Sequence, residues 1–134
     1  YFFIFYHNHT FESGQNGDYD GGVLEVSLDG GNSWQDLGSD ITTGGYNVNL
    51  AGGYDHPFAP APAWGADSNG FYLVEVDLSA YAGQIAKVRW RMGTDNSVGD
   101  GDWLIDDITI TDAGEYGVCT LFDPDLIFKH GFEQ

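Results

Sequence analysis

Alternating apolar and polar residues predict strands along most of the chain before residue 111. Residues 23–28 (VLEVSL), 71–78 (FYLVEVDL) and 85–92 (IAKVRWRM) place polar residues at roughly every second position, which is the period of a half-buried strand. Residues 1–6 (YFFIFY) and 103–110 (WLIDDITI) are more continuously apolar. No window longer than about one helical turn keeps an apolar 3.6-residue period without a Gly or Pro interruption. The chain is therefore predicted to form an all-β sandwich.

The most informative stretch is residues 20–34, DGGVLEVSLDGGNSW. Its strand is entered through Gly21-Gly22 and left through the sequence DGGN at 29–32. Asp-Gly and Gly-Gly pairs supply the positive φ angles that two-residue hairpin turns require. Trp34 and Leu37 follow at a spacing that lets both side chains pack back on the same sheet. We expect a strand, a tight hairpin and a short return strand.

Four segments together resemble the MAM-like jelly-roll domains appended to proteases and other multidomain exoproteins that bacteria secrete. They are HNHTFE at 7–12, the stretch at 20–34, VDLSAYAGQIAKVRWRMGTD at 76–95, and WLIDDITI at 103–110. The resemblance covers about residues 1–112 and implies an antiparallel jelly-roll β-sandwich with an accessory role. Residues 113–134 are then a C-terminal tail, either an added strand or a sorting or assembly segment. Its sequence LIFKHGFE resembles short C-terminal signatures on exported proteins of some Gammaproteobacteria.

The charge balance excludes two classes of partner. Twenty-one acidic residues stand against four Lys and Arg, which gives a net charge of −17 at pH 7. Nucleic acids and anionic membrane surfaces are bound chiefly through Lys and Arg, so this chain repels both. No apolar run reaches membrane-spanning length. Most of the carboxylates are interpreted as a solvated surface suited to salty or extracellular surroundings, and the others as ligands of bound cations.

The ends of the chain indicate a piece of an exported protein. There is no initiator Met and no signal-peptide pattern, so we interpret the chain as a processed or excised C-terminal part of a longer protein, secreted or displayed at the cell surface. A parent catalytic domain is expected upstream. Cys119 is the single cysteine, so it forms no intrachain disulfide, and its role stays open.

The apolar N-terminal strand is an aggregation hazard if it lies on an open sheet edge. Its composition suits a central strand that is covered on both faces. Alternatively, this strand or the apolar part of the tail completes the sheet of an adjacent copy by strand addition, giving a homo-oligomer. The candidate assembly residues are Phe2, Phe3, Ile4, Phe5, Leu126, Ile127 and Phe128.

Carboxylates in glycine-rich loops predict a structural Ca²⁺ site, because Ca²⁺ takes six to eight oxygens from carboxylates and carbonyls. The loop at 12–22 supplies Glu12, Asp18 and Asp20. The last strand supplies Asp106 or Asp107, since a regular pleat turns one of two adjacent residues toward the core, where a carboxylate needs a metal or strong hydrogen bonds. The resemblance implies the same place, where the first loop meets the last strand. A second site has at most Asp95, Asp100 and Asp102 as ligands.

No catalytic signature accompanies these carboxylates. His7 and His9 point to the same side of a strand and can chelate zinc, but no Cys lies nearby, so hydrogen-bonded histidines beneath the first loop are the favoured interpretation. The sequences G-x-S-x-G and H-E-x-x-H are missing, and no pair of carboxylates stands out for glycoside hydrolysis. The chain is expected not to be an enzyme.

Cations and aromatic residues offer two further surfaces. Lys87, Arg89 and Arg91 share one face of a predicted strand, where cross-strand pairing with Glu75 or Asp77 is expected and a dedicated anion site is the alternative. In the long loop at 38–70, possible ligand contacts are Tyr54, Phe58 and Trp64. Trp64 and Tyr46 also suit the rim of the core, which is the favoured place for both.

Three non-catalytic functions follow from these expectations. The first is a calcium-stabilised accessory domain that stabilises its parent protein or mediates adhesion. The second is a carbohydrate-binding module, because aromatic faces stack on sugar rings. The third is a self-assembling extracellular subunit that exchanges terminal strands with other protein subunits.

Overall fold

The computed structural model describes residues 1–96 and 101–111, and nearly all regular structure in these ranges is β-strand. Two three-residue 3-10 helices are the helical segments described, η1 at Gly38–Asp40 and η2 at Ser79–Tyr81, and neither is long or apolar enough to cross a membrane. The strands are β1 Phe2–Thr10, β2 Ser13–Gly14, β3 Gly17–Asp18, β4 Gly21–Ser27, β5 Gln35–Asp36, β6 Ile41–Thr43, β7 Val48–Asn49, β8 Pro62–Ala63, β9 Tyr72–Asp77, β10 Lys87–Gly93 and β11 Asp102–Thr111.

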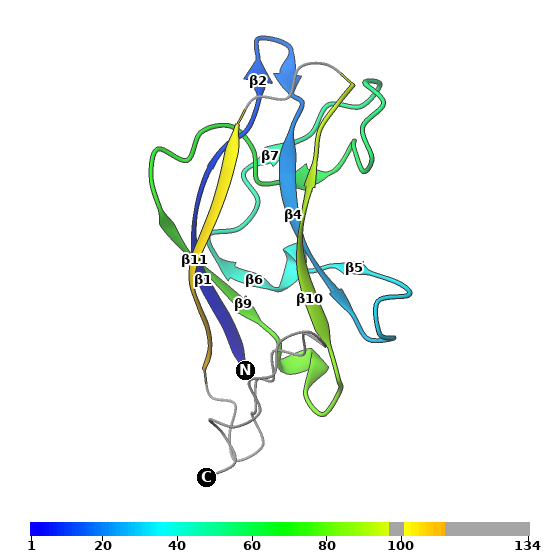
Figure 1. Ribbon diagram of the computed structural model, residues 1–134, viewed down its shortest axis with the longest axis vertical. Coiled ribbons are helices and arrows are strands. Elements are labelled where there is room, and N and C mark those ends of the chain that lie inside the picture. Colours follow the sequence, from blue (N-terminus) through cyan, green and yellow to red (C-terminus); the bar gives the residue numbers. More distant parts are fainter. Residues whose placement is uncertain (97–100, 112–134) are drawn as a thin grey trace, which may run out of the picture.

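The strands form two layers (Figure 1). The larger sheet has the order β11-β1-β9-β6 and the smaller one has the order β10-β4-β5, with antiparallel pairing throughout. The hairpins β2–β3 and β7–β8 form separate two-stranded sheets. The β2–β3 hairpin and the N-terminus lie at opposite ends of the molecule (Figure 1). The all-β antiparallel sandwich expected from the sequence is confirmed, whereas the jelly-roll strand order stays a prediction.

The core lies between the two sheets. Phe5 and Val74 from the larger sheet and Leu24 and Val26 from the smaller sheet are fully buried in one cluster. Trp64 reaches this cluster from the β7–β8 region and is also fully buried. Its Nε1 donates to the Gly44 carbonyl oxygen at 2.8 Å, so the indole buries its apolar area without leaving its N–H unpaired.

Strand β1 is central, as expected, because it pairs with β11 on one side and β9 on the other. Its inward positions Phe3, Phe5, His7 and His9 are all buried. The outward face is only partly covered, since Phe2 is 37% exposed and outward side chains alternate with the buried ones. The expectation that both faces are covered is therefore wrong. The structure places Phe2, Phe3, Ile4 and Phe5 inside a strand that is paired on both edges. The other candidate assembly residues, Leu126, Ile127 and Phe128, lie outside the described residues.

Strand β11 contains an irregularity that the sequence does not reveal. The pairing register with β1 shifts between Ile4 and Tyr6, and Asp107 adopts φ 51° opposite this shift. This is a β-bulge, in which an extra residue leaves the pleat. Asp106 lies opposite exposed Tyr6, and Asp107 is the residue at the bulge. Both are exposed, so the premise that one of them must face the core is wrong.

The turn after β4 is longer than the two-residue hairpin expected from the sequence. Gly30 and Gly31 have φ 77° and 101°, as the Asp-Gly-Gly pattern predicts. The reversal also depends on Asp29, whose carboxylate accepts hydrogen bonds from the Ser27 and Ser33 hydroxyls at 2.8 and 2.6 Å. These bonds stabilise the charged carboxylate, and they hold the pKa of Asp29 below its usual range.

Candidate functional site

Three carboxylates converge at the end of the sandwich that carries the β2–β3 hairpin. Glu12, Asp20 and Asp95 each offer an oxygen, and these oxygens all lie within 4.8 Å of one another. Glu12 follows β1, Asp20 precedes β4 and Asp95 follows β10. The group therefore joins three strand ends, contributed by both sheets. We call these three residues the carboxylate group.

Asp20 is the buried member, with 2% of its surface exposed. Its Oδ1 accepts a hydrogen bond from the Asp95 backbone N–H at 3.1 Å, which fixes the position of Asp95. Burial raises the pKa of Asp20 above its ordinary value, and the Asp95 charge also raises it. The Asp95 N–H and the nearby His56 act in the opposite direction. The site therefore disfavours the charge of Asp20 when nothing else compensates it.

The backbone holds this arrangement in place. The Glu12 carbonyl oxygen accepts hydrogen bonds from the Tyr19 and Asp20 N–H groups at 3.2 and 3.4 Å. The next residue is Gly21, where a Cβ would lie 2.7 Å from the Trp64 carbonyl oxygen. Because β4 begins this close to Trp64, Gly21 is required to bring Asp20 against the loop.

The predicted ligand set is only partly brought together. Glu12 and Asp20 belong to the carboxylate group, but Asp18 lies outside it, in β3. Asp106 and Asp107 are also outside it, because β11 holds them at the bulge opposite the middle of β1. The third member is Asp95, which was expected only in a second site. Of the other two residues expected in that second site, Asp102 lies exposed in β11, and Asp100 falls outside the described residues.

The histidine pair is a core feature. The His9 ring lies 3.0 Å from the Ala66 carbonyl oxygen through Nδ1 and 2.9 Å from the Tyr72 hydroxyl through Nε2. A carbonyl only accepts, so Nδ1 carries the proton and Nε2 accepts from Tyr72. His7 accepts at Nδ1 from the Trp103 Nε1–H at 3.1 Å. This hydrogen bonding, and not zinc ligation, is the role that the structure shows for both rings.

Burial of His7 is complete. Since Nδ1 accepts, the neutral ring carries its proton on Nε2, which has no hydrogen-bond partner among the described residues. Burial and the neighbouring His9 lower the pKa of His7 from 6.5 to about 3. The ring is therefore neutral at all moderate pH values.

The three aromatic residues proposed as ligand contacts do not form one surface. Trp64 is fully buried in the core, so it cannot contact a ligand, and the alternative placement in or near the core is correct. Tyr54 is 40% exposed and packs edge-on against Tyr19 with ring centroids 5.0 Å apart. Phe58 is half-buried and packs on the small cluster of Val23, Leu50 and Ala63.

The outer face of β10 carries a charged ladder. Arg89 donates through Nε to Glu25 at 2.6 Å, and Arg91 donates through Nη1 to the other oxygen of Glu25 at 3.5 Å. Glu25 lies opposite Arg89 on β4. The expected cross-strand pairing with an acidic residue is confirmed. The expected partners Glu75 and Asp77 are wrong, because they lie on β9 in the other sheet.

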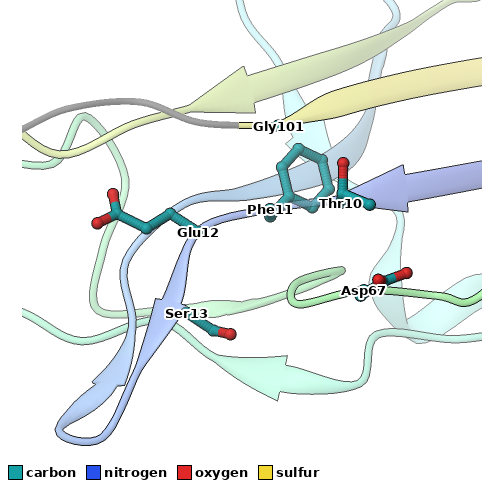
Figure 2. A pocket seen from close by; sticks show the side chains of 6 residues that line it. All are labelled: Thr10, Phe11, Glu12, Ser13, Asp67 and Gly101. Atoms are coloured by element: carbon teal, nitrogen blue, oxygen red, sulfur yellow. The ribbon is translucent and has the colours of Figure 1, made fainter.

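A polar pocket of about 360 Å³ lies beside the carboxylate group, lined by Thr10, Phe11, Glu12, Ser13, Asp67 and Gly101. Figure 2 shows the Glu12 carboxylate extending away from Thr10 and Asp67. The Thr10 hydroxyl accepts from the Asp102 N–H at 3.0 Å. Glu12 therefore directs its charge out of this pocket and toward the carboxylate group.

Comparisons of the chain with protein-family models, with curated proteins and with solved structures find no match.

Proposed function

We propose that this chain is a non-catalytic, calcium-stabilised accessory domain of an exported protein, and that it acts by binding. The observation that carries the proposal is the convergence of Glu12, Asp20 and Asp95 with Asp20 buried. Three like charges this close repel one another, and a divalent cation removes that repulsion. Such a cation would tie together the ends of β1, β4 and β10.

The donor set favours Ca²⁺ over a transition metal. All three side chains offer oxygen, which hard cations prefer, whereas zinc is usually held by Cys and His. The group lies on loops and strand ends, whose carbonyls and bound water can complete the six to eight ligands of Ca²⁺. The ion would have a structural role, because it would replace the repulsion among the three carboxylates by a link between the two sheets.

The accessory role rests on the sequence and on the fold together. The motifs resemble MAM-like domains of secreted bacterial proteins, and the two-layered β-sandwich is the architecture that such a resemblance implies. We therefore propose a secreted or surface location and a parent protein whose other domains carry any catalysis. Adhesion or parent stabilisation is the function proposed first. Glycan binding is the second candidate, favoured by the aromatic and arginine side chains on the outer face of β10.

Thermal unfolding of the full chain tests the calcium proposal. We expect EDTA to lower Tm by about 10 °C relative to protein in Ca²⁺ at 100 times its Kd, because a ligand bound only by the native state stabilises it by about 2.7 kcal/mol at that ratio. Adding Ca²⁺ back should restore Tm, and Mg²⁺ should restore it less, since it binds loosely built oxygen sites poorly. An EDTA-treated protein with unchanged Tm and no Ca²⁺ in a direct titration would overturn the proposal.

A further inference from the structure

The cations of the described residues gather on one face of one strand. Lys87, Arg89 and Arg91 alternate along β10, so their side chains leave the same face of the smaller sheet. Glu25 is the carboxylate between the two arginines, and it compensates one of their charges. Asp36 lies opposite Glu25 on β5, so an anion at this face would be held by hydrogen bonds from the guanidiniums and not by a net positive charge.

Both guanidinium groups have unused donors. Each guanidinium carries five N–H groups, and each of these two arginines makes one hydrogen bond within the described residues. Each arginine side chain is 37% exposed, whereas Glu25 is 12% exposed. Glu25 is therefore the more buried partner, and both arginine side chains reach solvent. A second carboxylate can accept from them without displacing Glu25.

Aromatic rings lie beside both arginines. The Arg89 guanidinium carbon lies 3.9 Å from the centroid of a Trp34 ring, and the Arg91 carbon lies 5.2 Å from the centroid of Phe58. These contacts are within the range of cation–π attraction, which restricts where the guanidiniums can point. Trp34 and Phe58 are both half-buried residues.

The position of Phe58 is built into the fold. A Cβ on Gly93, the last residue of β10, would clash with the rings of Phe58 and His56. His56 accepts hydrogen bonds at Nδ1 from the Phe58 and Ala59 N–H groups at 3.2 and 3.1 Å. This loop is therefore seated over the end of β10 before any ligand arrives, which lowers the entropy cost of binding.

We propose that Arg89 and Arg91, with Trp34 and Phe58 beside them, bind the carboxylate of an acidic sugar. A uronic acid combines a carboxylate, which matches guanidinium donors, with a C–H face that packs on an aromatic ring. A nucleic acid fits poorly, because its closely spaced phosphates meet the repulsion of the whole chain. This inference names a ligand class for the binding role proposed above and needs no bound Ca²⁺.

The test is a calorimetric titration of the full chain with trigalacturonate, beside its methyl ester and neutral trigalactose. We expect binding of trigalacturonate alone, weakened as salt rises. Arg91→Gln should weaken it about tenfold. Glu25→Gln should strengthen it severalfold, because it removes the negative charge that compensates one of the arginine charges and repels a second carboxylate. Lys87→Gln is the matched control: its Nζ donates to the Gly30 carbonyl oxygen at the far end of the strand, and its effect should be below twofold.

Repeating each titration in Ca²⁺ and in EDTA separates this site from the carboxylate group. Equal affinity of the folded protein in both conditions supports the arginine site. Binding that disappears in EDTA and is unaffected by Arg91→Gln would mean that the sugar coordinates calcium instead, and it would overturn the inference. Weaker binding in the Glu25→Gln variant, at unchanged Tm, would also overturn it. The calcium proposal is judged by Tm alone, so either proposal can fail while the other stands.

Discussion

The histidine pair and the carboxylate group both place titratable side chains out of water, but they meet the cost of burial in opposite ways. His7 and His9 sit between the sheets among aromatic rings, and the pKa of each is lowered, so each stays neutral. Asp20 sits at the end of the sandwich beside Glu12 and Asp95, and its pKa is raised. A neutral imidazole can be buried without any compensating charge. A cluster of carboxylates needs a proton or a cation to reduce the repulsion among its charges.

The difference shows where this fold gains stability from packing alone and where it depends on its surroundings. Among the described residues, the hydrogen bonds of the histidine pair are formed within the protein, with His7 Nε2 left unpaired. Under the calcium proposal, the carboxylate group would instead link the stability of the fold to the concentration of a cation in solution. We therefore expect acid and a chelator to act on the two regions separately.

The largest effect on stability is expected from removing the Trp64 indole, against which His7 packs. Trp64→Ala should lower the free energy of unfolding by about 3–5 kcal/mol, because it leaves a large cavity in a dense core. The His7 and Trp64 ring centroids are 4.7 Å apart. Urea unfolding at pH 7 measures the loss. Tyr54→Ala, at a 40% exposed position, should cost far less, and equal losses in the two variants would contradict the core assignment of Trp64.

The second-largest effect is expected from acid, which should lower the free energy of unfolding through the protonation of His7. A free histidine has a pKa near 6.5 and folded His7 has one of about 3, so between these values only the unfolded chain takes up the proton. The free energy of unfolding is therefore highest above pH 6.5 and falls as the pH falls. At pH 4 it should be lower by about 3 kcal/mol. The titratable groups that face His7 are His9 and Tyr72, and Asp67 acts on His9.

His7→Gln provides the comparison, since the amide oxygen can still accept from Trp103 but cannot be protonated. Its unfolding free energy, followed from pH 7 to pH 4, should fall less than that of the unmodified chain by roughly the same 3 kcal/mol. His56→Gln, outside the core cluster, controls for the loss of a histidine. Parallel pH curves for the unmodified chain and His7→Gln would show that His7 does not carry this acid sensitivity.

The smallest effect is expected at Asp20, and its sign should depend on calcium. Without Ca²⁺, Asp20→Asn should raise the free energy of unfolding by about 1 kcal/mol, because it removes a disfavoured buried charge and keeps an oxygen for the Asp95 N–H. With Ca²⁺ present, the same change should lower stability, because a ligand is lost. Asp18→Asn, outside the group, should do neither. A gain in stability under both conditions would indicate that no cation binds at Asp20.

The strands were predictable because their signal is local. Alternation placed β4, β9 and β10 within a few residues. It also put His7 and His9 on one side of β1, which the structure shows to be the buried side. The carboxylate group was half predictable. Glu12 and Asp20 lie in one glycine-rich loop, whereas Asp95 arrives only because β10 pairs with β4 and ends beside Gly21.

The misses have the same physical origin, since each depended on how distant strands meet. The partner of Arg89 is Glu25 and not Glu75, and the choice depends on which strands share a sheet. The exposure of Asp107, which regular alternation would have turned toward the core, depends on a register shift against β1. Trp64 follows a proline-rich run with no periodicity, so the rim of the core was its favoured place from composition alone, and the structure shows it fully buried in the core.

The bulge in β11 has a consequence for how copies of this domain behave as neighbours. Within the described residues, β11 pairs with β1 alone and forms one border of the larger sheet. An incoming strand along that border would meet an interrupted hydrogen-bond ladder and two adjacent negative charges, Asp106 and Asp107. Two identical borders would bring four such charges together. Crowded copies of the domain would therefore be hindered from joining their sheets along this border.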